Sequence, residues 1–189
     1  MPFYGRRREL KMLDDIFARA HGKLFVLYGR RRVGKTALIQ HWLSARKPRG
    51  FYWAAHQSSS PILLRALSHE IQRVRFPGQE VPAEFTFSSW DMAFREIASL
   101  AQDAPLVVVL DEFTYLLESD RSIASLLQNT WDGVLKDTNI FLILSGSHAG
   151  MIARDVLAYR SPLFGRAAQT LHLQPLPFGV VTEMFPKMP

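Results

Sequence analysis

The chain has 189 residues, which is enough for one α/β domain, and it contains no cysteine, so disulfide bonds and thiolate metal sites are excluded. Its N-terminus lacks an apolar signal core, and no apolar run approaches the roughly 20 residues of a membrane-spanning helix, so we expect a cytoplasmic protein without a membrane partner. The formal net charge of +6, concentrated at residues 6–8, 30–32 and 46–49, favours an anionic partner, either a nucleotide or, through a basic surface, nucleic acid.

The pattern of apolar residues and turn residues predicts helices that alternate with strands. Helices are expected over residues 7–20, 35–45, 61–75, 90–100, 123–135 and 149–158, and strands over 24–28, 51–54, 106–110, 140–144 and 170–173. This alternation is typical of parallel βαβ units, so the predicted fold class is α/β with a covered sheet. We expect one core domain over residues 1–174, followed at 175–189 by the start of a missing lid or by a C-terminal tail.

A glycine-rich motif connects the first predicted strand to the helix that follows it. Residues 29–36, Gly-Arg-Arg-Arg-Val-Gly-Lys-Thr, satisfy the P-loop pattern G-x-x-x-x-G-K-[ST] in full. The glycines let the backbone surround a phosphate with its N–H groups, and the N-terminus of the helix adds a positive dipole. Lys35 is expected to reach the β- and γ-phosphates of ATP, and the Thr36 hydroxyl to bind Mg²⁺.

The predicted nucleotide-binding residues are Gly29, Arg30, Arg31, Arg32, Val33, Gly34, Lys35, Thr36, Ala37 and Tyr4. Tyr4 is included because it and Phe3 lie just before the first basic cluster, where either ring can stack on adenine. Packing as ordinary core aromatics explains both residues equally well.

Two carboxylates follow the most apolar predicted strand. Asp111 and Glu112 thus lie at the carboxyl end of a strand, which is where ligands bind in open α/β sheets. Asp111 can hold Mg²⁺ through water, and Glu112 can polarise the water that attacks the γ-phosphate. A helix cap is the alternative interpretation of this pair, and the P-loop in the same chain favours the catalytic one.

Two further residues are candidates for contact with the transferred phosphate. Ser145 ends a predicted strand, and a polar residue in this position senses the γ-phosphate in P-loop ATPases; Ser147 is the second choice. Capping of the next helix is the alternative role of both serines. Arg166 precedes the last predicted strand and can offset charge in the transition state, in its own subunit or in a neighbouring one. A salt bridge at the edge of the sheet is its alternative role.

Taken together, the motifs resemble one family of ATPases. The matching segments, in chain order, are 3–6, 28–36, 111–116, 131–137, 145–147 and 159–166, and they are similar to the archaeal-type ATPases, which belong with the AAA+ and STAND P-loop proteins. The resemblance implies a three-layer P-loop NTPase fold with a parallel five-stranded sheet in the order 5-1-4-3-2. It also implies a helical lid after the core. The sequence stops where this lid would begin, so we expect an arginine of the lid to be absent and turnover to be slow.

Two functions are compatible with these motifs. In the first, the chain hydrolyses ATP to ADP and phosphate with Mg²⁺, as the core of a nucleotide-driven switch or motor, and Glu112 beside Asp111 is the feature that favours it. In the second, the chain binds ATP without hydrolysis and presents a surface to a protein or DNA partner, which the absent lid favours. Assembly into a homo-oligomer is compatible with both.

Overall fold

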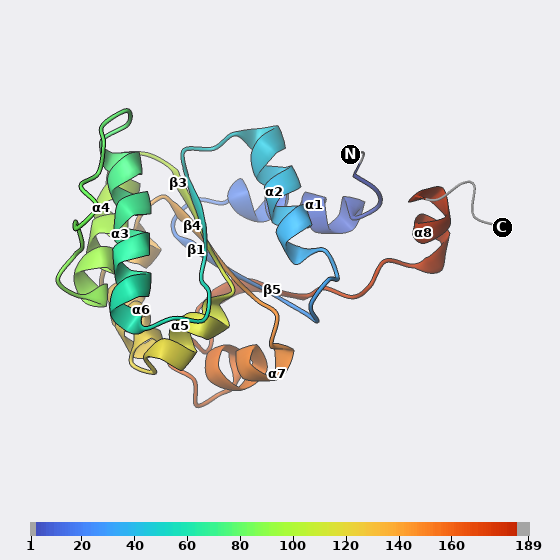
Figure 1. The fold of residues 1–189 in the computed structure, drawn as a ribbon. Helices are drawn as coiled ribbons and strands as arrows, with labels where there is room; N and C mark the ends of the chain where they lie inside the picture. The colour runs from blue at the N-terminus through green and yellow to red at the C-terminus, as the bar shows by residue number, and fades with distance from the viewer. Residues whose placement is uncertain (1–2, 185–189) are drawn as a thin grey trace.

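A parallel five-stranded sheet forms the centre of the computed structural model, which describes residues 3–184 (Figure 1). The strands are β1 Lys23–Tyr28, β2 Gly50–Ala54, β3 Leu106–Asp111, β4 Ile140–Gly146 and β5 Ala167–His172. Their order across the sheet is β2-β3-β4-β1-β5, and all four neighbouring pairs are parallel. The predicted fold class and the predicted strand order are confirmed.

Helices cover both faces of this sheet (Figure 1). One face carries α1 Arg7–Phe17 and α2 Lys35–Arg46, and the other carries α3 Ser60–Arg75, α4 Trp90–Asp103 and α6 Ile123–Gly133. The shorter helices are α5 Phe113–Ser119, α7 Ala149–Ile152 and α8 Phe178–Met184, with a 3₁₀ turn at Leu135–Asp137 and a π-helical turn at Ala153–Leu157. No helix in the described part of the chain is long and apolar enough to cross a membrane.

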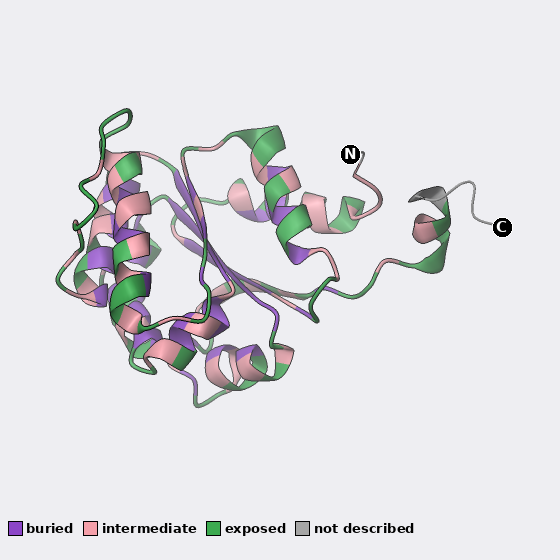
Figure 2. Cartoon of the chain, viewed as in Figure 1, coloured by how far each residue is buried: buried purple, intermediate pink, exposed green. Residues whose placement is uncertain are grey.

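Alternation of side chains along the strands divides the core into two apolar layers. In β1, Leu24 and Val26 pack with the helices α3, α4 and α6, whereas Phe25 and Leu27 pack with α1 and α2. All four side chains are fully buried, and burial of such a side chain contributes about 1.5–3 kcal/mol relative to its exposure. Figure 2 shows the buried sheet between helices whose outer faces are exposed. The two layers fix the sheet, and with it the loops at the carboxyl ends of the strands.

The structure corrects several predicted boundaries. The first helix ends at Phe17 because the chain turns after Ala18, and His21 adopts a left-handed conformation with φ 64°. The helix expected over 123–135 ends at Gly133, and the helix expected over 149–158 is a short α-helix followed by the π-helical turn. Strand β5 begins at Ala167 rather than at residue 170.

Two helices were not predicted. Helix α5 directly follows Glu112, whose left-handed conformation (φ 52°) ends the strand and starts the helix within one residue. Helix α8 lies beyond β5 within the segment predicted as a lid or tail, of which residues 185–189 are outside the described part of the chain. The N-terminal segment packs beside α8. This packing is close, since a Cβ placed on Gly5 would lie only 3.0 Å from a methyl group of Val180.

Candidate nucleotide and magnesium site

The P-loop joins β1 to α2 through two glycines that no other residue replaces without strain. Gly29 has φ 156°, and a Cβ there would lie 2.5 Å from the carbonyl oxygen of Leu173. Gly34 has φ 96° and directly precedes the first turn of α2. Positive φ values of this kind are accessible to glycine at little cost. The loop therefore has the backbone that the sequence pattern predicts, with the N-terminus of α2 at its end.

The side chain of Lys35 lies inside this loop. Its Nζ donates hydrogen bonds to the carbonyl oxygens of Gly29 (3.0 Å) and Arg30 (3.1 Å), and the residue is buried. Burial lowers the pKa of the Lys35 ammonium, and the nearby carboxylates of Glu112 and Asp111 oppose that shift. Two backbone carbonyls are weak partners for a buried charge compared with an anion, so the ammonium is placed to exchange them for phosphate oxygens.

Asp111 connects β3 to α2 and to β2. Its Oδ2 accepts a hydrogen bond from Thr36 Oγ1 (2.8 Å) and another from the hydroxyl of Tyr52 (2.5 Å), while its Oδ1 accepts one from the backbone N–H of Glu112 (2.9 Å). Asp111 is only 2% exposed, so these groups take the place of water around it. The two predicted metal ligands, Thr36 and Asp111, are thus in direct contact. Burial and the bond to Asp111 raise the pKa of Tyr52, which therefore remains a donor.

Glu112 is connected to the strand on the other side of β3. Its Oε2 accepts hydrogen bonds from the backbone N–H (3.1 Å) and the hydroxyl (2.7 Å) of Ser147, which follows β4. The left-handed backbone of Glu112 turns the chain sharply between β3 and α5. A non-glycine residue in this conformation costs about 1–3 kcal/mol, and residues of this kind cluster at functional sites. Ser147, the second choice for a phosphate sensor, is thus in contact with the predicted base, and its role as a sensor stays a prediction.

Ser145 has a hydroxyl that the protein leaves unpaired. It lies inside β4, opposite Leu27 of β1, and its Oγ is the one buried side-chain oxygen or nitrogen without a hydrogen-bond partner among the described residues. Leaving such a group unpaired costs about 1–3 kcal/mol, so a water or a ligand atom is expected to pair with it. Ser145 does not cap α7, because the residue before that helix is His148.

Arg166 forms a salt bridge in this structure. Its Nε and Nη2 donate to the two carboxylate oxygens of Asp132 in α6 (2.9 and 2.6 Å), and its Nη1 donates to the carbonyl of Phe164 (3.0 Å). The bond from Arg166 holds the pKa of Asp132 below its usual value. The sheet-edge salt bridge that was the alternative role of Arg166 is therefore present, and its catalytic role stays a prediction.

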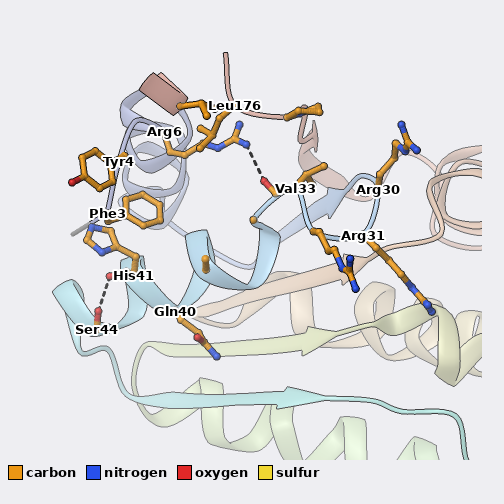
Figure 3. A pocket seen from close by; sticks show the side chains of 15 residues that line it. Phe3, Tyr4, Arg6, Arg30, Arg31, Val33, Gln40, His41, Ser44 and Leu176 are labelled. Atoms are coloured by element: carbon orange, nitrogen blue, oxygen red, sulfur yellow. Dashed lines mark hydrogen bonds between the residues drawn. The ribbon is translucent and has the colours of Figure 1, made fainter. Parts of the chain in front are cut away.

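A pocket of about 970 Å³ opens beside the P-loop, on the face of the sheet that carries α1 and α2 (Figure 3). Seven of the ten predicted nucleotide-binding residues line this pocket: Tyr4, Arg30, Arg31, Arg32, Val33, Gly34 and Ala37. Gly29, Lys35 and Thr36 do not line the pocket and belong to the phosphate side of the loop. The site therefore has two parts, one suited to a base and sugar and one suited to phosphates and a cation.

The pocket also contains residues that the sequence analysis missed. One turn apart on α2, Gln40, His41 and Ser44 share its wall with Ala37, and Phe3 stacks on His41 with ring centroids 4.0 Å apart. Pro175, Leu176 and Val181 enter from the segment after β5. The spacing of the α2 residues, at i, i+3, i+4 and i+7 from Ala37, was the one signal in the sequence that would have found them.

Arg6 connects the parts of this pocket. Its Nη2 donates to the carbonyl oxygens of Val33 in the P-loop (3.0 Å, dashed in Figure 3) and of Gln174 after β5 (2.7 Å), and its Nη1 pairs with Glu9 (2.9 Å). The Arg6 side chain is only 7% exposed. The first arginine of the basic cluster 6–8 is thus a structural residue that fixes the N-terminal segment against the loop.

The basic cluster 46–49 is also partly engaged within the chain. Arg46 forms a bidentate pair with Asp14 of α1 (2.9 and 2.6 Å), and Arg49 donates to the carbonyl oxygen of Leu100 at the end of α4 (2.9 Å). The bond from Arg46 lowers the pKa of Asp14. The pair with Asp14 offsets the charge of Arg46, and the bond to Leu100 occupies one donor of Arg49, so fewer groups of this cluster are free for nucleic acid.

Comparisons with known proteins place the chain among ATPases. A family model described as an ATPase domain predominantly from Archaea matches residues 3–188. An uncharacterized protein of Methanocaldococcus jannaschii is 31% identical over 185 residues, which are 98% of this chain and 38% of that protein. An uncharacterized ATP-binding protein of the same organism is 44% identical over 45 residues, 24% of this chain and 76% of that protein. The chain thus spans well under half of the first of these relatives.

Solved structures with the same fold include chains about twice as long as the part that superimposes. A Walker-type ATPase of Pyrococcus abyssi superimposes with a TM-score of 0.72 at 23% identity, over 96% of this chain and 56% of that one. The ORC1 protein of Aeropyrum pernix, solved in complex with DNA, superimposes with a TM-score of 0.65 at 15% identity, over 98% of this chain and 49% of that one. At these identities the similarity is one of fold.

Proposed function

Because this chain belongs to the family of ATPase domains found predominantly in Archaea, we propose that it binds MgATP at the P-loop and hydrolyses it to ADP and phosphate, as the core of a nucleotide-driven switch or motor. The observation that carries the proposal is the meeting of Thr36, Asp111 and Glu112 at the carboxyl ends of β1 and β3, beside a buried lysine. Ligands bind at this edge in open α/β sheets.

The residues present fit a magnesium ion. Mg²⁺ prefers oxygen ligands and is bound through one or two protein groups, with phosphates and water supplying the rest. Thr36 and Asp111 offer a hydroxyl and a carboxylate in contact, and the described residues contain no cluster of three or more metal-binding side chains that would favour a different metal. When bound, Mg²⁺ would offset the charge on the β- and γ-phosphate oxygens.

Other groups of the chain bind the nucleotide and activate the attacking water. The P-loop N–H groups and the Lys35 ammonium bind the phosphates, and the pocket beside Tyr4 and Ala37 takes the base and sugar. Glu112, oriented by Ser147, accepts a proton from the attacking water. The unpaired hydroxyl of Ser145 donates to a γ-phosphate oxygen, which removes the cost of leaving it unpaired.

Phosphate release by the purified chain, measured in excess Mg²⁺ and in EDTA, tests the proposal. We expect slow release of phosphate in Mg²⁺ and none above background in EDTA. Tight ATP binding without any release of phosphate would instead support a binding module that does not hydrolyse ATP.

Arg166 is expected to act on the nucleotide of a neighbouring subunit, because it lies just before β5, where AAA+ relatives often place an arginine finger. To do so its guanidinium would leave Asp132, to which it is bound in this structure. The specific activity of the parent should then rise with protein concentration, and that of Arg166→Ala should not. Arg160→Ala is the control, since Arg160 lies in the same loop and has no hydrogen bond or ion pair with the described residues. A loss of rate in Arg166→Ala at the highest dilution would show action within one chain, and equal rates in both proteins would remove any catalytic role.

We expect only weak, salt-sensitive binding of duplex DNA, because Arg46 and Arg49 are engaged within the chain. Each contact with a phosphate contributes about 0.9 to the slope of log K against log salt. Lys47→Gln should therefore reduce the slope by about 1, and Arg46→Gln should leave it nearly unchanged. Fluorescence anisotropy of a labelled duplex over a salt series measures both. Sequence-selective binding at sub-micromolar concentration would contradict this expectation.

A further inference from the structure

The hydroxyl of Tyr52 lies in the candidate magnesium site, although neither the P-loop nor the carboxylate pair includes it. Tyr52 belongs to β2, the edge strand, and lies in register with Val109 of β3. Its ring packs in the apolar layer beneath α2, the helix whose first turn carries Thr36. From there the hydroxyl reaches Oδ2 of Asp111, the same oxygen that accepts from Thr36.

These bonds define the hydrogen-bond directions around Asp111. A carboxylate only accepts hydrogen bonds, so Tyr52 and Thr36 both act as donors to it. The proton of the Thr36 hydroxyl is then directed at Asp111, and its lone pairs remain free for a cation. The N–H of Glu112 occupies Oδ1, so both oxygens of Asp111 are fixed. Without the phenol, Asp111 would have one fewer bond that opposes rotation about its side-chain torsions.

We propose that Tyr52 is a positioning residue for the metal half of the site: its hydroxyl fixes the orientation of the Asp111 carboxylate, and through it the Thr36 hydroxyl, toward Mg²⁺. The inference rests on the proposed MgATP site. Groups that hydrogen-bond to a metal-binding side chain in this way typically change metal affinity by about 10–100-fold when they are removed. A purely structural tyrosine would affect folding and would not distinguish ATP from MgATP.

Tyr52→Phe tests the inference, because it keeps the buried ring and removes only the hydroxyl. The measurement is the dissociation constant of ATP by calorimetry, once in EDTA and once in excess Mg²⁺. The constant in EDTA divided by the constant in Mg²⁺ reports the coupling between metal and nucleotide. We expect Tyr52→Phe to reduce this ratio by about tenfold, with the constant in EDTA and the melting temperature close to those of the parent. Tyr159→Phe, which removes an exposed hydroxyl, is the matched control.

A second variant shows whether Tyr52 acts through Asp111. In the background of Asp111→Ala, the Tyr52→Phe change should have no further effect on the ratio, because the group it positions is gone. An equal effect in both backgrounds would contradict the inference, as would a Tyr52→Phe protein with the parent's ratio. If the parent itself binds ATP equally well in EDTA and in Mg²⁺, the proposed metal site fails, and the inference fails with it.

Discussion

Replacement of Glu112 by Gln is expected to lower the rate of ATP hydrolysis by about 10²–10⁴-fold and to leave MgATP binding close to that of the parent. The amide has the shape of the carboxylate, and its oxygen still accepts the two hydrogen bonds from Ser147. It does not accept a proton from water at neutral pH. The loss therefore falls on the chemical step, and phosphate release under single-turnover conditions, alongside calorimetry of MgATP binding, separates the two effects.

Glu118→Gln is the matched control for this variant. Glu118 lies on α5, seven residues after Asp111, the last residue of β3. It is exposed and has no ion pair with the described residues. The control should hydrolyse ATP at the parent's rate. If Glu112→Gln also does so, another group is the base, and the contact between Glu112 and Ser147 has a structural role only.

The fold was predicted well where one local pattern determines the structure. The strands β1, β3 and β4 are continuous apolar runs buried on both faces, and a parallel central strand produces this pattern whatever surrounds it. Strand β5 lies at the edge and alternates between half-buried and exposed residues, and its first residues, Ala167 to Gln169, include no large apolar or β-branched side chain that would predict a strand. Its start is determined by pairing with β1, which the local sequence does not encode.

The candidate site divides in a similar way. Residues 29–36 were predicted from their own spacing, because a phosphate-binding loop needs glycines and a lysine at fixed distances along the chain. Tyr52 was assigned no role at the site, and Arg6 was assigned only a share in the attraction of the cluster 6–8 to an anion. The contacts of each are with partners far away in sequence: Tyr52 with Asp111, and Arg6 with Val33 and Gln174. Such contacts exist only once the sheet has formed.

The role of Arg166 could not be decided from the sequence. The sequence analysis left both a catalytic and a structural role open, and the structure shows the guanidinium on Asp132. Both side chains are partly exposed, and pairs of this kind contribute about 0–1 kcal/mol. So small a stabilisation does not prevent Arg166 from leaving Asp132 for a phosphate, and the concentration series described above decides between the roles.

Lys35→Ala is expected to weaken ATP binding by tenfold or more, which corresponds to at least about 1.4 kcal/mol, and to abolish measurable hydrolysis. In the P-loop pattern, this ammonium is the group that reaches the β- and γ-phosphates. Without nucleotide it is buried against the carbonyl oxygens of Gly29 and Arg30, and burial lowers its pKa, so the free protein holds this charge at a cost. Removing it should therefore leave the melting temperature near that of the parent.

Calorimetry with ATP measures the loss, and Lys136→Ala provides the control for it. Lys136 is exposed, its backbone carbonyl accepts from the N–H of Gly22, and its side chain has no hydrogen bond or ion pair among the described residues. The control should bind ATP as the parent does. Because the free protein gains little from the Lys35 ammonium, a weaker affinity in Lys35→Ala reports lost contacts with phosphate rather than a damaged fold. Equal affinities in the parent and in a folded Lys35→Ala protein would mean that the loop at residues 29–36 does not bind the phosphates.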